Sequence, residues 1–146
     1  MEYQFNFEKL DVWQDSRKLA ADIYLVTREF PADEKYAIIQ QIRRAVVSVA
    51  SNLAEGSTRT SPKEQAHFTT ISFGSLMELL NQLIISSDLG YLKTERLTDF
   101  RNKIQSLSVR LSNLKKSQVS KIKGLKVIVW MILAPQLFQT LQPVTL

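Results

Sequence analysis

A row of polar side chains between residues 43 and 59 has a composition that could support acid–base chemistry. Arg44, Ser48, Asn52, Glu55 and Arg59 follow one another at spacings of four, four, three and four residues. On an α-helix, which has about 3.6 residues per turn, these side chains form one polar stripe beside an apolar one. Glu55 could then act as a general acid or base, with Asn52 and Ser48 as orienting groups.

The same stripe also fits a purely structural role. A catalytic site needs a nucleophile or a metal beside the carboxylate, and the sequence supplies neither there. A later segment carries a matching polar row with Ser75 and Glu78, and Gly74 would allow close approach of the backbone. Two antiparallel helices with such rows can satisfy each other, with Arg43 or Arg44 paired to Glu78. We therefore favour a structural polar network over a catalytic or ligand-binding site, and its members are Arg43, Arg44, Ser48, Asn52, Glu55, Ser75 and Glu78.

No other residues form a recognisable catalytic or metal-binding pattern. Some helical-bundle ribonucleases carry an Arg and a His close together on one helix. Here seven residues separate Arg59 from His67, and Ser61 and Pro62 interrupt the helix between them. Acidic residues show no paired metal-ligand spacing, cysteine is absent, and no glycine-rich phosphate loop follows a strand. We expect no enzymatic activity, no metal and no cofactor.

Positive charge is concentrated in the last third of the chain. The formal net charge is +5, and the region between Lys93 and Lys126 holds ten Lys or Arg residues against Glu95 and Asp99. Such a row of cations can follow nucleic-acid phosphates without reading sequence, although a solvated helix face looks the same. No aromatic residues alternate with these cations, so stacking on bases is not expected. The candidate nucleic-acid-binding residues recur at about one heptad and are Arg96, Lys103, Arg110, Lys115 and Lys116.

Four amphipathic helices must position these residues. Apolar residues at helical spacing predict helices over about 12–30, 33–57, 62–89 and 94–118. The third helix has the clearest boundaries. Ser61 is its expected N-cap, Pro62 its first residue and Glu64 the partner in a capping box, while Gly90 ends it.

The short connections between these helices favour antiparallel neighbours. We therefore expect an all-α protein, an up-down-up-down four-helix bundle over residues 1–123. Residues 124–146 contain an apolar run and two prolines. We expect them to form an irregular C-terminal tail, either a short helix or a disordered extension.

The composition favours a cytoplasmic protein. Of the 146 residues, 45% are hydrophobic and 23% are charged, as in an ordinary globular domain. The N-terminal stretch is acidic and aromatic, unlike a signal peptide. The longest apolar run, 127–134, is much shorter than the roughly 20 residues that span a bilayer. We therefore expect no membrane partner.

Several short motifs, each weak alone, together resemble a known family. They are Phe7, Leu10, Asp11, Val12 and Trp13; Tyr24; Phe30 and Pro31; Gln41, Arg43, Arg44 and Ala45; Ser48; Asn52 to Gly56; and Gly74, Ser75, Glu78 and Leu79. Over roughly residues 5–117, this pattern resembles the four-helix bundle proteins encoded in intervening sequences of bacterial 23S ribosomal RNA genes.

The resemblance implies a bundle that assembles into a ring, expected to be a homopentamer, and it implies no enzymatic activity. Similar bundles, the accessory variability determinant proteins of diversity-generating retroelements, are thought to bind nucleic acid and a reverse transcriptase. By analogy, the chain would bind RNA, DNA or such an enzyme through a basic surface. The alternative is a structural or assembly protein without a nucleic-acid role. Family members usually end soon after the fourth helix, so the tail inherits no function from the resemblance.

Overall fold

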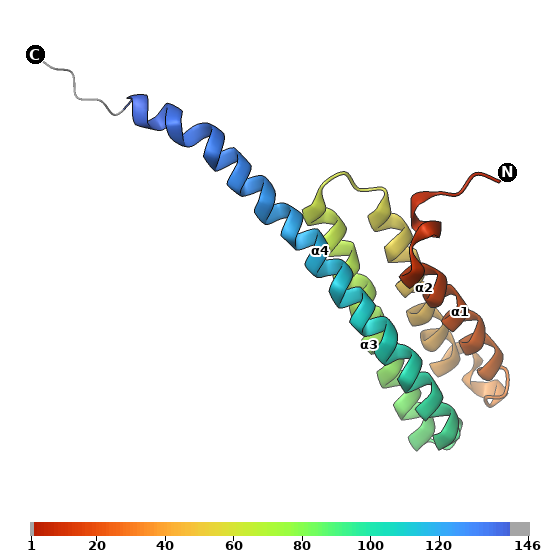
Figure 1. Cartoon of the computed structure of the whole chain (residues 1–146). Coiled ribbons are helices and arrows are strands. Elements are labelled where there is room, and N and C mark those ends of the chain that lie inside the picture. The colour runs from red at the N-terminus through yellow and green to blue at the C-terminus, as the bar shows by residue number, and fades with distance from the viewer. Residues whose placement is uncertain (1, 141–146) are drawn as a thin grey trace, which may run out of the picture.

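The computed structural model describes residues 2–140, and four α-helices account for most of them. Successive helices run in opposite directions (Figure 1), and each of the pairs α1–α2, α2–α3, α3–α4 and α1–α4 is in contact. The expected all-α, up-down-up-down four-helix bundle is therefore confirmed. The helices are α1 (Asp11–Val26), α2 (Ile38–Ser57), α3 (Pro62–Asp88) and α4 (Thr94–Thr140), with short 3-10 helices η1 (Asn6–Lys9) and η2 (Ala32–Tyr36).

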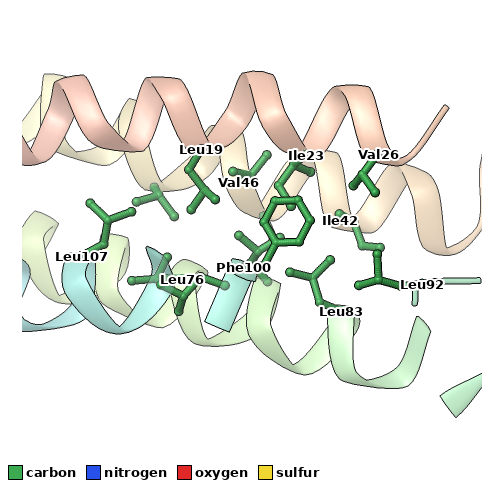
Figure 2. Close-up of a cluster of buried hydrophobic side chains, with 14 of the residues drawn as sticks. Leu19, Ile23, Val26, Ile42, Val46, Leu76, Leu83, Leu92, Phe100 and Leu107 are labelled. Carbon is green, nitrogen blue, oxygen red and sulfur yellow. The ribbon is translucent and has the colours of Figure 1, made fainter. Parts of the chain in front are cut away.

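Each helix buries the apolar stripe that its sequence predicts. The stripes of all four helices meet in one cluster (Figure 2), in which Ile23, Ile42, Leu76 and Leu83 are fully buried. Burying one such side chain stabilises the folded state by about 1.5–3 kcal/mol. The cluster therefore fixes how the helices face one another, and with them the polar side chains on their flanks.

Small residues bring α2 and α3 especially close together. The buried Ser72 of α3 donates its hydroxyl hydrogen to the Val49 carbonyl of α2 at 2.8 Å. Gly56 of α2 is also buried, and a Cβ placed there would lie 2.8 Å from the Phe68 Cβ of α3. Any residue larger than glycine would force the two backbones apart at that point.

Two helix boundaries in the first half of the chain differ from the expectation. α1 ends at Val26, not near Phe30, and α2 begins at Ile38, not near residue 33. Ala37 has φ −112° and ψ −112°, which lies outside the helical region and prevents a continuous helix from η2 into α2. Phe30 is nevertheless buried, with 6% of its surface exposed. Phe30 therefore packs into the core from a loop. Its spacing from the apolar residues of α1 is the same as in a longer helix, so periodicity alone does not distinguish the two cases.

The boundaries of α3 match the expectation except for the capping box. Pro62 is the first helical residue, and Gly90 has a φ of +77°, a backbone conformation that favours glycine. The Ser61 side chain, however, makes no capping hydrogen bond, so the expected capping box with Glu64 is wrong. The N-terminus of α3 instead begins with the Gln65 N–H donating to the Ser61 carbonyl at 3.0 Å.

α4 continues far beyond the other three helices (Figure 1). It comprises 47 residues, which corresponds to a length of about 70 Å at 1.5 Å per residue. The tail expected over residues 124–146 was a short helix or a disordered extension, whereas residues 124–140 continue α4 without a break. Residues 141–146 lie outside the described part of the chain. Six large apolar side chains in this extension are 52–65% exposed: Leu125, Val127, Ile128, Val129, Met131 and Ile132.

α3 is long and apolar enough to cross a membrane, and it is the one described helix that meets this criterion. Its apolar side chains Leu76, Leu79 and Leu83 are fully buried in the bundle core. The composition of α3 is therefore explained by its position between α2 and α4.

Candidate nucleic-acid interface

Two of the five candidate cations on α4 form ion pairs with α1. Lys103 Nζ lies 2.6 Å from Asp22 Oδ2, and Arg110 Nη1 lies 2.5 Å from Asp15 Oδ2. The two aspartates are seven residues apart on α1, and the two cations are seven residues apart on α4. Antiparallel packing of these helices therefore brings both pairs into register. The four side chains are 36–52% exposed, and each pair is therefore worth about 0.2–1 kcal/mol. These two cations hold the α1–α4 contact and are partly neutralised.

The other three candidates remain exposed. Arg96, Lys115 and Lys116 have no ion-pair partner among residues 2–140. No Asp or Glu occurs after Asp99, although lysines continue along α4. At about 100° per residue, four of these lysines fall within about 100° of arc on one side of the helix. We call these four the basic segment of α4: Lys115, Lys116, Lys123 and Lys126.

The expected polar network forms in part. Ser48 of α2 and Ser75 of α3 share a hydrogen bond, with their hydroxyl oxygens 2.8 Å apart. Asn52 Nδ2 donates to the Ser48 hydroxyl at 3.0 Å and to the Ser48 carbonyl at 2.8 Å. Ser75 is buried, whereas Ser48 and Asn52 are half-buried. These three residues thus link α2 to α3 through neutral hydrogen bonds.

The expected ion pair between Glu78 and Arg44, or alternatively Arg43, does not form among the described residues. Arg43 points toward α1, where its Nε donates to Thr27 Oγ1 at 2.9 Å and its guanidinium lies 4.6 Å from the Tyr24 ring centroid. Glu78 is exposed on α3 and accepts a hydrogen bond from Gln82 Nε2 at 3.0 Å. The sequence placed the two charges on neighbouring helices, but Arg43 lies on the flank of α2 that faces α1.

The acidic end of the polar stripe is a local surface feature. Glu55 Oε1 pairs with Arg59 Nη2 at 2.6 Å, one helical turn further along the chain. The Arg59 guanidinium also lies 4.9 Å from the Phe68 ring centroid on α3. His67 is exposed, and the described residues contain no group of three or more His, Cys, Asp or Glu that could hold a metal ion. Within the described chain, the ion-pair partner of Glu55 is therefore Arg59.

A second basic surface, which the sequence did not predict, lies between α1, η2 and α2. It is a groove of about 340 Å³ whose polar lining includes three cations, Lys35, Arg43 and Arg44. No acidic residue lines this groove, which we call the basic–aromatic groove. No local sequence pattern indicates this groove, because its tyrosines and cations lie on three separate elements. Its full lining is Tyr24, Lys35, Tyr36, Ile39, Gln40, Arg43, Arg44 and Val47.

Glu34 of η2 does not line this groove, and its two hydrogen-bond partners also lie outside the lining. Glu34 Oε1 accepts a hydrogen bond from the Tyr91 hydroxyl at 3.0 Å, and Glu34 Oε2 accepts one from the Ile38 N–H at 3.4 Å. The hydrogen bond to Glu34 raises the pKa of Tyr91 above its ordinary value, because it favours the neutral phenol. Glu34 is thus committed to anchoring η2 against the start of α2 and the α3–α4 connection.

Comparison with known proteins identifies a family. The family model described as 23S rRNA-intervening sequence protein matches residues 8–113, which is most of the chain. No curated protein matches the chain. The matched region contains the bundle, the Ser48–Ser75 link and the basic–aromatic groove, whereas the basic segment lies beyond it. The chain therefore belongs to the 23S rRNA-intervening sequence protein family.

Proposed function

We propose that the chain is a non-enzymatic, cytoplasmic helical-bundle protein that binds RNA, or DNA of similar charge, through its basic surface. The observation that carries this proposal is the absence of any acidic residue after Asp99, on a helix with exposed lysines. Arg96 and the basic segment have no carboxylate partner in residues 2–140, so their charges are available to phosphates. Lys103 and Arg110 contribute less, because each already pairs with an aspartate of α1.

Binding of this kind gains free energy from the release of counterions condensed on the nucleic acid. Each neutralised phosphate contributes a slope of about −0.9 to log K against log salt on duplex DNA, and about −0.7 on single strands. Lysine side chains that contact only phosphates do not distinguish base sequences. We therefore expect α4 to bind nucleic acids of many sequences at low salt and to lose them at a few hundred millimolar salt.

We further propose that the chain assembles into a homo-oligomer, and the family resemblance favours a pentamer. Ile71 and Ile85 of α3 and Val109 of α4 are 38–55% exposed on the outer surface of the described bundle. Exposed apolar side chains on neighbouring helices are suited to burial between subunits. A ring would display five basic segments at once, so that individually weak phosphate contacts act together.

A mobility-shift titration of RNA at several salt concentrations tests the proposed function. The variant in which Lys115, Lys116, Lys123 and Lys126 are replaced by glutamine should bind more weakly and show a flatter salt slope. The double variant Lys103→Gln, Arg110→Gln is the matched control, since it removes cations that already have acidic partners. If the quadruple variant binds as the parent does at every salt concentration, the basic segment is not a nucleic-acid surface.

The ion pairs between α1 and α4 favour a second candidate, a structural or assembly protein without a nucleic-acid role. In that case the cations of α4 serve mainly to hold helices together and to keep the surface solvated. The two candidates differ in one observable. The structural protein would form its oligomer but would cause no salt-dependent shift of RNA mobility.

A further inference from the structure

The basic–aromatic groove combines features that the basic segment of α4 lacks. We propose that this groove binds one unpaired nucleotide of a single-stranded nucleic acid, with its phosphate on the cations and its base on the Tyr36 ring. This inference rests on the proposed function, and it adds a site on α2 and η2 that is separate from α4. It predicts a preference for single strands, which the basic segment alone does not provide.

The cations of the groove are arranged to receive an anion. Arg43 is held in place by its hydrogen bond to Thr27 and by the Tyr24 ring, so little side-chain entropy remains to be lost on binding. Arg44 follows it on α2, and Lys35 lines the same groove from η2. Because the lining contains no carboxylate, these three positive charges are not neutralised within the groove. A phosphate is the group that such a cluster of cations recognises best.

The tyrosine at the groove supplies the second half of the site. The side chain of Tyr36 is 80% exposed, although exposure of its phenol ring to water is unfavourable. The Lys35 ammonium lies 5.3 Å from the centroid of the Tyr36 ring. Unpaired bases stack on exposed aromatic rings, and one such contact strengthens binding by about tenfold or more. Bases in a duplex are already stacked on their neighbours, so only a single strand can offer one to Tyr36. Gln40 also lines the groove and provides a hydrogen-bonding amide for a base edge.

The size of the groove agrees with a ligand of this class. Its volume of about 340 Å³ is at the lower end of the range for small-molecule sites, about 300–1,000 Å³, and suits one nucleotide. A protein partner is the competing occupant, since Tyr and Arg are also frequent at protein interfaces. The surplus of three cations with no acid favours a polyanion over a typical protein surface.

Fluorescence anisotropy with labelled RNA tests the inference. The parent protein is titrated into an oligouridine of about ten nucleotides and into a duplex RNA of equal charge, at several salt concentrations. Tyr36→Leu should weaken oligouridine binding by about tenfold, leave its salt slope unchanged and leave duplex binding unchanged, because stacking releases no counterions. Arg44→Gln should instead flatten the oligouridine slope by about 0.7, the contribution of one phosphate.

Two matched variants serve as controls. Tyr3→Leu removes another exposed tyrosine, and Lys63→Gln removes an exposed cation of α3, both outside the groove. They should bind both RNAs as the parent does. Tyr36 is so exposed that its replacement should not unfold the bundle, which circular dichroism would verify.

The outcomes separate this inference from the proposed function. If the parent binds RNA and Tyr36→Leu binds oligouridine equally well, the groove inference is wrong while the proposed function stands. If the Tyr36→Leu variant instead changes the molecular mass with unchanged RNA affinity, the groove is a subunit contact and the inference is again wrong. If the parent binds neither RNA at low salt, both proposals fail together.

Discussion

Replacing Gly56 with alanine should destabilise the bundle, although alanine is the better helix former. The new Cβ would lie 2.8 Å from the Phe68 Cβ and 3.5 Å from the Phe68 Cγ. The Phe68 Cβ is attached directly to the backbone of α3, so a change of side-chain rotamer cannot relieve the contact. The backbones of α2 and α3 would have to separate by a substantial fraction of an ångström to restore ordinary van der Waals distances.

The magnitude follows from two opposing effects. Overpacking of this kind costs about 1–3 kcal/mol, whereas exchanging glycine for alanine in a helix gains about 1 kcal/mol. The net change at Gly56 should therefore be a loss of about 1 kcal/mol in the free energy of unfolding. Gly74 of α3 is the matched control, because it is exposed and a Cβ there would contact nothing within 4 Å. Gly74→Ala should stabilise the bundle by about 0.5–1 kcal/mol.

Urea denaturation followed by circular dichroism, at one protein concentration for all variants, measures both changes. The same substitution should thus shift the midpoint in opposite directions at the two positions. A second variant sharpens the test. Adding Phe68→Ala to Gly56→Ala should not rescue stability, since the Cβ that causes the closest contact remains. If Gly56→Ala is as stable as Gly74→Ala, the close approach of α2 to α3 described above is incorrect.

Three further predictions concern the surface. A double-mutant cycle with Asp15→Asn and Arg110→Gln should give a coupling energy of about 0.2–1 kcal/mol that falls with added salt. A coupling energy of zero would mean that this ion pair between α1 and α4 does not form in solution. Glu78→Ala should change the free energy of unfolding by less than about 0.5 kcal/mol, because Glu78 is exposed; a loss of several kcal/mol would restore a buried ion pair. Deleting residues 124–146 should leave the thermal midpoint almost unchanged, because the described side chains from 124 to 129 are exposed. A large fall in the thermal midpoint would reveal packing of this segment against another subunit.

The architecture could be predicted from the sequence because the helices carry regular apolar stripes. The buried set on α2 and α3 follows this spacing closely, and it depends only on residues three or four apart. Phe30 shows the limit of such reasoning. A loop residue can continue the periodicity and still pack into the core, so the pattern overestimates the length of α1.

The candidate sites were less predictable because ion pairs and grooves depend on residues far apart in the chain. Asp22 and Asp15 lie 81 and 95 residues from Lys103 and Arg110, and no local pattern reveals that they meet. The sequence pattern therefore overestimates the number of unpaired cations on α4, because it includes Lys103 and Arg110. Glu78 does not pair with an arginine of α2 for a related reason. Helix spacing indicates on which face of its own helix a residue lies, but it does not indicate which neighbouring helix that face contacts.

The basic–aromatic groove was missed for the same reason. The absence of aromatic residues among the cations of α4 argued against stacking on bases, and that argument holds only along one helix. Tyr36 and Arg44 lie on consecutive elements that fold against each other at Ala37, where the backbone leaves the helical conformation. A stacking surface can therefore arise from residues that do not alternate in the sequence.

Ultraviolet cross-linking of the parent protein to RNA, with the cross-linked peptides identified by mass spectrometry, tests the central claim most directly. At low salt, cross-links should appear in peptides of α4 that contain Lys115 and Lys116 and in the peptide that contains Tyr36. They should disappear at a few hundred millimolar salt, as expected for contacts dominated by phosphates. Cross-links confined to other surfaces, or none at low salt, would contradict the assignment of these two basic surfaces to nucleic-acid binding.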